Sequence, residues 1–162
     1  MITSLVDVRI AVIGLGYVGL PLAVHMARYF PVVGFDIDVE ATVIAHQTAA
    51  EQRPSLPVSL FAGSVEALRL RPAFDLVLAN LIPAEAQPLL PGLRALLAAE
   101  GLLVLAGLME DQRAGSEAEL AANGFVVERL MEREEWVGLV CVAAAIRPRT
   151  AGPEPPPGLV RN

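Results

Sequence analysis

A glycine-rich turn near the start of the chain restricts the fold more than any other feature. Gly14, Gly16 and Gly19 have the spacing G-x-G-x-x-G, directly after an apolar run that predicts a buried strand and directly before a segment that predicts a helix. In such a turn the first glycine permits a tight bend, the second lets the backbone approach a ligand, and the third lets the helix pack closely on the strand. The free N–H groups at the start of the helix favour an anionic or polar ligand.

An acidic residue follows the turn by about 20 residues, at the end of the second predicted strand, as a nucleotide site requires. This residue is Asp36, whose carboxylate can accept hydrogen bonds from ribose hydroxyls. Two structural alternatives stay open: the glycines serve only close packing, or Asp36, in competition with Asp38, caps the next helix. We expect the turn, the acid and its neighbour to bind a nucleotide cofactor through Gly14, Gly16, Tyr17, Val18, Gly19, Asp36 and Ile37.

The rest of the chain alternates short apolar runs with longer segments that predict helices. Strands are expected over residues 8–13, 31–35, 57–61, 74–79, 102–105, 125–130 and 136–143. Helices are expected over residues 18–29, 39–51 and 110–122, with a further one that begins near residue 84 and contains two prolines. This alternation predicts a Rossmann-like, doubly wound α/β fold with a mostly parallel sheet of about seven strands. The last two strands are too close in sequence for a helical crossover, so we expect an antiparallel hairpin at one edge of the sheet.

Length and composition favour a single globular domain. The chain has 162 residues, of which 54% are hydrophobic and 19% charged, and this composition indicates a folded core. We expect one nucleotide-cofactor-binding domain over residues 1–146 and a flexible, proline-rich tail over residues 147–162. The net charge of −6 argues against nucleic acid as a partner and is compatible with a basic protein substrate.

The remaining sulfur and imidazole groups give no sign of a metal or disulfide site. Cys141 is the single cysteine and lies in an apolar strand, which predicts a buried, inert thiol and a reducing compartment. His25 and His46 lack ligand-spaced partners, so we expect no metal. The sequence has no apolar run long enough to cross a membrane and no signal-peptide pattern, so we expect a cytoplasmic protein. The oligomeric state stays open.

Polar residues after two other predicted strands complete the candidate site. Asn80 ends the fourth strand and Ser64 follows the third, at the edge of the sheet where ligands of open α/β folds bind. Each has a structural alternative, because Asn80 also suits a turn or helix cap and Ser64 also suits a helix N-cap. Glu110 and Asp111 suit the negative charge favoured at a helix start, and Trp136 suits packing at the sheet edge.

Two stretches of the chain resemble two different enzyme families. Residues 8–37, with IAVIGLGYVGLPLAV and FPVVGFDID, resemble the NAD-binding start of nucleotide-sugar dehydrogenases of the UDP-glucose and UDP-N-acetylmannosamine type. Residues 36–143 resemble the PrmA family of ribosomal large-subunit protein methyltransferases, which are class I S-adenosylmethionine enzymes. The matching segments are LFAGSVEAL, FDLVLANLIPAE, GLLVLAGLMEDQ and NGFVVERLMEREEWVGLV. The chain therefore resembles a fusion joined near Asp36.

The two resemblances imply different cofactors. The methyltransferase resemblance implies S-adenosylmethionine, with Ser64 beside its adenine and Asn80 orienting the protein amine that accepts the methyl group. The dehydrogenase resemblance implies NAD. The chain departs from the methyltransferase family at Val12, where the family has an acid, and we expect it to lack the further domains of both families. Three hypotheses follow: a methyltransferase-like enzyme acting on a protein amine, an NAD-binding domain without chemistry of its own, and a catalytically silent hybrid.

Overall fold

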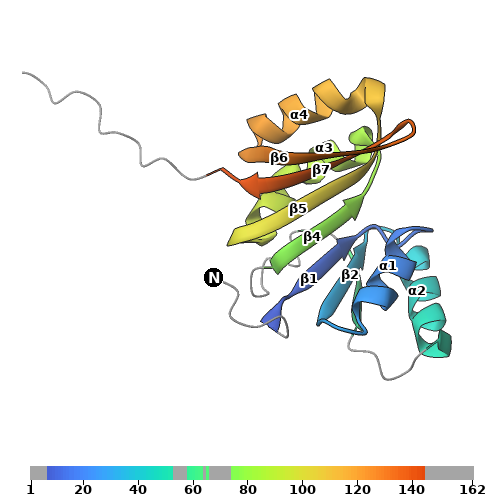
Figure 1. The fold of residues 1–162 in the computed structure, drawn as a ribbon. Helices are drawn as coiled ribbons and strands as arrows, with labels where there is room; N and C mark the ends of the chain where they lie inside the picture. Colours follow the sequence, from blue (N-terminus) through green and yellow to red (C-terminus); the bar gives the residue numbers. More distant parts are fainter. Residues whose placement is uncertain (1–6, 53–57, 64, 66–73, 145–162) are drawn as a thin grey trace, which may run out of the picture.

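A computed structural model describes residues 7–52, 58–63, 65 and 74–144, and these form one twisted seven-stranded sheet with flanking helices (Figure 1). The proline-rich tail expected over residues 147–162 lies outside the described residues, as does Ser64. None of the described helices is long and apolar enough to cross a membrane.

The described strands and helices alternate along the chain as the sequence predicts. In order they are β1 (Ile10–Ile13), α1 (Gly19–Met26), β2 (Val32–Asp36), α2 (Val39–Gln52), β3 (Val58–Ala62), β4 (Phe74–Asn80), α3 (Pro83–Leu96), β5 (Leu97–Met109), α4 (Arg113–Ala122), β6 (Phe125–Arg133) and β7 (Trp136–Ala143). The strand order is β3-β2-β1-β4-β5-β7-β6. Strands β1 to β5 are parallel, and β7 is antiparallel to both β5 and β6. The predicted fold class, with its C-terminal antiparallel hairpin, is confirmed.

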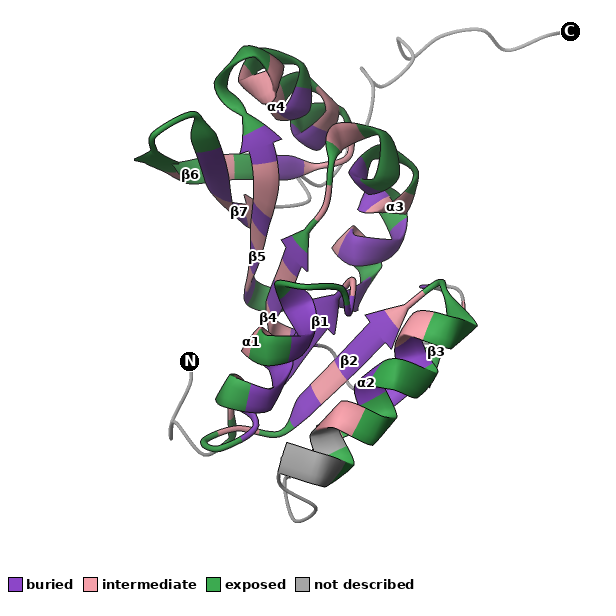
Figure 2. Ribbon diagram, turned by 90° about the vertical axis from the view of Figure 1, so that its right-hand side faces the viewer, coloured by how far each residue is buried: buried purple, intermediate pink, exposed green. Residues whose placement is uncertain are grey.

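Strand β1 lies at the centre of the sheet and is buried on both faces. Ile10 and Val12 pack into an apolar cluster with α1 and α2, whereas Ala11 and Ile13 pack into a second cluster with α3 and α4. Successive side chains of a strand point to opposite faces, so one four-residue apolar run supplies both cores. Figure 2 shows the sheet with α1 on one side and α3 on the other, and β1 buried between them.

Strand β5 is longer than the apolar run that predicted it. It spans 13 residues, Leu97–Met109, where only residues 102–105 were expected. Its first residue pairs with Phe74 before a register shift, and regular pairing resumes at Leu102. A Cβ on Gly101 would lie 2.7 Å from the carbonyl oxygen of Phe74, so this close approach of the two strands needs glycine. The residues added before Leu102 include alanine and glutamate, which have weak strand preference, so the sequence pattern does not reveal this part of the strand.

Burial of Cys141 generates a prediction about its thiol. The side chain is 0% exposed in β7, and burial, with a smaller contribution from the charge of Glu117, raises the pKa of the thiol to about 12. The thiol is therefore neutral in the folded protein at pH values where an exposed cysteine, with a pKa of 9.0, begins to ionise. We expect iodoacetamide to leave the native protein unmodified near pH 8.5 and to modify it fully in guanidinium chloride, as measured by mass spectrometry.

The raised pKa of the Cys141 thiol also makes the stability of the folded protein depend on pH. The neutral thiol favours the folded state below pH 9, and this contribution is lost as the pH rises from 9.0 toward 12. Rapid modification of the native protein would contradict the buried position of Cys141.

Candidate functional site

A cavity of about 690 Å³ lies at the carboxyl ends of β1, β2 and β4, where the glycine turn leaves β1. Strand β1 has β2 on one side and β4 on the other, so the connections run in opposite directions from this point, as at ligand sites of open α/β sheets. The volume lies within the range of small-molecule sites. All the sequence-predicted binding residues that the structure describes line the cavity: Gly14, Gly16, Tyr17, Val18, Gly19, Asp36, Ile37 and Asn80.

The three glycines of the turn have distinct steric environments. Gly14 has a φ of +85°, which disfavours any residue with a Cβ. A Cβ on Gly19 would lie 1.7 Å from the carbonyl oxygen of Gly14, so the contact between α1 and the turn requires glycine. A Cβ on Gly16 would meet nothing within 4 Å. Gly19 is therefore needed for packing of α1 against the turn, whereas the space beside Gly16 is open toward the cavity.

Asp36 ties the end of β2 to the glycine turn. Its Oδ2 accepts a hydrogen bond from the N–H of Leu15 at 2.7 Å, and its Oδ1 accepts one from the N–H of Asp38 at 2.9 Å. Asp38, in turn, accepts a hydrogen bond from the N–H of Glu40 at 2.8 Å and so caps α2. The cap that the sequence left open between the two aspartates thus belongs to Asp38. Each oxygen of Asp36 keeps a further lone pair that can accept a ribose hydroxyl.

Apolar side chains stand exposed at the mouth of the cavity. The side chain of Tyr17 is 102% exposed and that of Ile37 is 76% exposed, although both line the cavity. Ile37 directly follows Asp36, so its apolar surface lies beside the position where a ribose would bind. A ligand with a flat, apolar base would cover surface that water contacts here.

Asn80 lies between the cavity and a smaller pocket. It is exposed at the end of β4 and borders both the main cavity and a pocket of about 270 Å³ that extends to the β6–β7 hairpin. The N-terminal cap of α3 is Ile82, with no side-chain hydrogen bond, so Asn80 does not cap that helix. Trp136 lines the same small pocket and is 51% exposed, which differs from the packed edge position expected from the sequence. A polar amide and an aromatic ring therefore border one pocket.

Helix α3 supplies a wall of the cavity that sequence reasoning missed. Glu85, Pro88 and Leu89 line the cavity from this helix. The helix continues through Pro88 and Pro91, although neither proline can donate the usual backbone hydrogen bond. Because of these prolines, the sequence did not define the residue at which the helix begins. A start at Pro83 would have placed Glu85 and Leu89, four residues apart, on one face.

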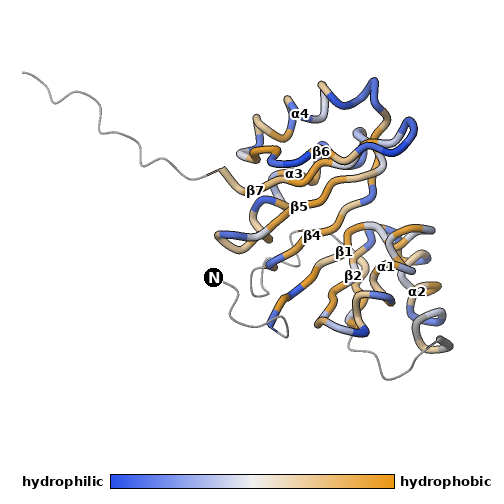
Figure 3. The backbone as a smooth tube through the Cα atoms, viewed as in Figure 1, coloured by the Kyte–Doolittle hydropathy of each residue, from blue (hydrophilic) through white to orange (hydrophobic). Residues whose placement is uncertain are grey.

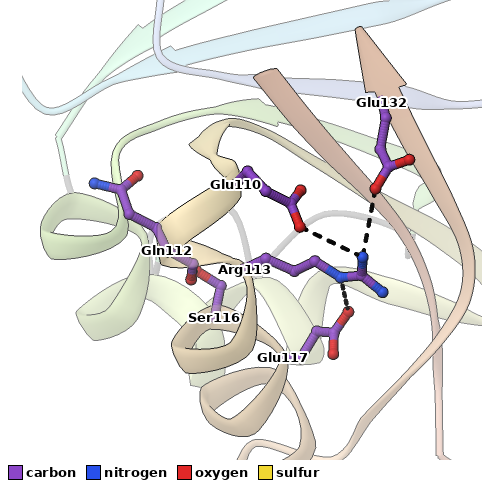
Figure 4. Close-up of polar contacts among 6 residues, drawn as sticks. All are labelled: Glu110, Gln112, Arg113, Ser116, Glu117 and Glu132. Carbon is purple, nitrogen blue, oxygen red and sulfur yellow. Dashed lines mark hydrogen bonds and ion pairs between the residues drawn. The ribbon is translucent and has the colours of Figure 1, made fainter. Parts of the chain in front are cut away.

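The β6–β7 hairpin beside the small pocket is held to α4 by Arg113 (Figure 4). The guanidinium of Arg113 lies 2.8 Å from Glu117, 3.4 Å from Glu132 on β6 and 3.8 Å from Glu110. The hydrogen bond with Glu117 and these negative charges raise the pKa of Arg113. Glu110, predicted to be a residue of a helix start, lies in a 3₁₀ helix over Glu110–Gln112, and α4 begins only at Arg113.

The chain segment between β5 and α4 is further ordered by two hydrogen bonds. The side-chain oxygen of Gln112 accepts the N–H of Met109 at 3.0 Å, and the hydroxyl of Ser116 donates to the carbonyl oxygen of Gln112 at 3.0 Å. Both side chains are visible in Figure 4 beside the Arg113 cluster. Gln112 and Ser116 line a separate pocket with residues of α3, and neither lines the pocket beside Asn80.

The two histidines take structural positions. The ring of His25 packs edge-on against that of Tyr29, with centroids 6.0 Å apart. The Nε2 atom of His46 lies 3.2 Å from the carbonyl oxygen of Leu60. Within the described part of the chain, no group of three or more histidine, cysteine, aspartate and glutamate side chains is arranged to hold a metal ion.

Comparison with known proteins points to one family. Residues 7–144 match the family model described as ribosomal protein L11 methyltransferase (PrmA). The chain is 33% identical over 104 residues to the ribosomal protein L11 methyltransferase of Pasteurella multocida, covering 64% of this chain and 34% of that protein. It is 30% identical over 128 residues to the protein of the same name from Chelativorans sp., covering 77% of this chain and 44% of that protein. The chain thus spans less than half of the length of these relatives.

A solved structure agrees on the fold. The crystal structure of ribosomal protein L11 methylase from Lactobacillus delbrueckii subsp. bulgaricus is similar with a TM-score of 0.74 and 24% identity, covering 88% of this chain and 73% of that chain. At this identity the likeness concerns the fold alone.

These comparisons do not support the dehydrogenase half of the expected fusion. The family match begins at residue 7 and so includes the glycine turn and Asp36. The departure at Val12 also has a structural explanation, because this side chain is 1% exposed and packs into the cluster with α1 and α2. Val12 is not among the residues that line the cavity, so an apolar side chain there strengthens the core without blocking the site.

The contrast between Gly16 and Gly19 can be tested by two single substitutions. We expect Gly19→Ala to lower the free energy of unfolding by about 3 kcal/mol or more, because the added Cβ overlaps the backbone of the turn. The matched variant Gly16→Ala should change it by less than about 0.5 kcal/mol, because the added Cβ meets open space. Urea denaturation followed by circular dichroism measures both values. Equal stability of the two variants would contradict the packing described for the turn.

Proposed function

Because the chain belongs to the ribosomal protein L11 methyltransferase (PrmA) family, we propose that it is an S-adenosylmethionine-dependent methyltransferase that methylates an amine of a protein. The observation that carries this proposal is the cavity at the carboxyl ends of β1, β2 and β4. It combines an open glycine turn, a carboxylate placed for a ribose and Asn80 at the boundary with a second pocket.

The residues present suit an adenosine group with an attached amino acid. Asp36 offers free lone pairs to ribose hydroxyls, and Ile37 offers apolar surface to the base. Gly16 and the start of α1 offer space and N–H groups to a carboxylate. We infer that Gly14, Gly16, Tyr17, Val18, Gly19, Asp36, Ile37 and Asn80 form the cofactor site, and that Ser64, between the lining residues Gly63 and Val65, adds to it.

In methyl transfer from a sulfonium to a neutral amine, the main task of the protein is to position the two reactants. When bound, S-adenosylmethionine supplies a methyl group on a sulfonium, and the lone pair of a neutral amine forms the new N–C bond while the C–S bond breaks, the neutral thioether leaves and the amine releases a proton. Correct orientation of the amine accounts for much of the rate in such a displacement. No metal is needed to activate either group.

Asn80 is the residue we assign to this orientation. Its amide oxygen can accept an N–H of the amine, which directs the lone pair toward the cofactor cavity without protonating it. The pocket beyond Asn80, with Trp136 and Met131, gives space to the chain that carries the amine. Among the described residues, Asn80 is the only one that lines both the cavity and the smaller pocket.

The relatives suggest the class of substrate. They are named for ribosomal protein L11, so we propose a protein amine of that kind as the acceptor. The net charge of −6 is compatible with a basic substrate. This chain spans 34% and 44% of the two relatives, so ribosomal protein L11 is proposed here only as the class of acceptor.

The cofactor assignment can be tested by binding. We expect S-adenosylhomocysteine to bind in isothermal titration calorimetry and NAD to give no saturable heat. Replacing Asp36 by Asn removes the charge that holds the ribose and should weaken S-adenosylhomocysteine binding by about tenfold or more. The matched control Asp38→Asn retains a good helix cap and should leave binding unchanged. Binding of NAD alone, or equal affinity of both variants, would contradict the assignment.

The role of Asn80 can be tested by activity. We expect Asn80→Ala to lower methyl transfer to ribosomal protein L11 by about 100-fold in kcat, because the amine loses its orienting group. Asn123→Ala is a suitable control, because Asn123 ends α4 and lines neither of the two pockets. Radiolabelled methyl transfer measures the rate, and calorimetry checks that S-adenosylhomocysteine still binds. An unchanged rate in the Asn80 variant would exclude this role.

A further inference from the structure

A second pocket of about 520 Å³ lies between α3 and α4, on the side of the sheet that these two helices cover. Its lining residues come from the start of α3, from β5, and from α4 with the short segment before it. Among the described residues, none lines both this pocket and the main cavity, or both this pocket and the pocket beside Asn80. We call it the α3–α4 pocket. Its volume lies within the range of small-molecule sites.

The floor of the α3–α4 pocket is apolar. Ala86 and Leu90 line it from α3 and Leu105 lines it from β5, and each of the three is 2% exposed. All three belong to the hydrophobic cluster on this side of the sheet. Figure 3 shows β5 as hydrophobic along most of its length, whereas hydrophilic residues are spread along α4. The apolar body of a ligand can therefore cover the floor while a polar group of the same ligand contacts α4.

Gly115 leaves space at the α4 wall of the pocket. It is the third residue of α4, and glycine is less favourable than alanine within a helix. A Cβ added at Gly115 would meet no atom of the described residues within 4 Å, and its φ is not positive, so neither packing nor backbone conformation requires glycine there. Because Gly115 lines the pocket, a larger residue would take up space that a ligand can fill.

Glu119 is the one charged residue that lines the α3–α4 pocket in the part of the chain that the structure describes. It lies four residues after Gly115, on the same side of α4. It is half-buried, and its carboxylate forms no hydrogen bond or ion pair with another described residue. Glu117, by contrast, lies 2.8 Å from Arg113. A carboxylate that is partly removed from water without a cation beside it favours a cationic ligand.

The buried hydroxyl of Ser116 adds a hydrogen-bond acceptor next to Glu119. Ser116 is 8% exposed and lies three residues before Glu119, so the two residues are neighbours on α4. The hydroxyl donates its hydrogen to the carbonyl oxygen of Gln112 at 3.0 Å, so only its lone pairs can contact a ligand. The side-chain amides of Gln87 and Gln112 also line the pocket and are neutral. The carboxylate and the hydroxyl therefore both select a ligand that donates hydrogen bonds.

We propose that the α3–α4 pocket binds a small organic cation, an ammonium or guanidinium group on an aromatic or aliphatic body. The cationic group donates hydrogen bonds to the carboxylate of Glu119 and to the hydroxyl oxygen of Ser116, and the body covers Leu90 and Leu105. An anion is a poor ligand, because the full negative charge of Glu119 outweighs the partial positive charge, roughly half a unit, at the start of α4. This site is separate from the cofactor cavity and does not depend on the proposed function.

Binding can be measured with phenethylamine, which is positively charged at neutral pH, by NMR titration of the backbone amide signals of the 162-residue chain. We expect saturable shifts at Gly115, Ser116 and Glu119. Phenethyl alcohol has the same aromatic body without the charge and should bind at least about tenfold more weakly. Equal binding of the two compounds, no saturable shift with phenethylamine, or shifts centred on Asn80 and Trp136 in place of α4 would each overturn the assignment.

Two variants separate the contributions of charge and space. Glu119→Gln should weaken phenethylamine binding by about tenfold or more, because the amide keeps the shape and loses the charge. The matched control Glu128→Gln changes the net charge equally at an exposed residue of β6 that does not line the pocket, and should leave binding unchanged. Gly115→Leu should abolish binding without lowering the midpoint of urea denaturation, because leucine fills the pocket and suits a helix. Unchanged binding in either the Glu119 or the Gly115 variant would contradict the site.

Discussion

The cofactor end of the molecule depends on one close contact, between the start of α1 and the turn that precedes it. The backbone of Gly19 lies so near the carbonyl oxygen of Gly14 that no side chain fits between them. This contact holds the first turn of α1 at the end of β1. Asp36 adds a second tie, from the end of β2 to the N–H of Leu15. Together they fix the backbone that borders the cavity, so a ligand meets a surface that is already in place.

The same arrangement explains how a small domain supports both a core and a site. β1 sends Ile10 and Val12 to one cluster and Ala11 and Ile13 to the other, so the helices on both sides of the sheet pack against one strand. Because Val12 is buried in the core, the carboxylate that lines the cavity belongs to Asp36, at the end of the neighbouring strand β2. The buried side chain of Val12 and the cavity-lining carboxylate of Asp36 thus come from neighbouring strands, at the point where the strand order changes direction.

The pocket that we propose for the acceptor is built by elements that are distant in sequence. Asn80 ends β4, whereas Met131 and Trp136 come from the β6–β7 hairpin, and these three side chains border one pocket. The hairpin is kept in place through the contact of Arg113 with Glu132. Exposed ion pairs of this kind are individually weak. The pairing of β7 with β5 and β6 therefore determines where the hairpin lies, and the ion pairs refine it.

The sequence by itself determined the order of strands and helices, the parallel sheet with its closing hairpin, and the turn with Asp36 at the next strand end, because these depend on local periodicity and on glycine positions. It could not assign the cap of α2 to Asp38 instead of Asp36, since both lie next to the helix start. Their roles are separated by two hydrogen bonds, from the N–H of Leu15 to Asp36 and from the N–H of Glu40 to Asp38. The length of β5, the wall that α3 adds to the cavity and the exposure of Trp136 were decided by tertiary structure. Each depends on which distant strand or helix lies alongside, and periodicity along the chain carries no information about that neighbour.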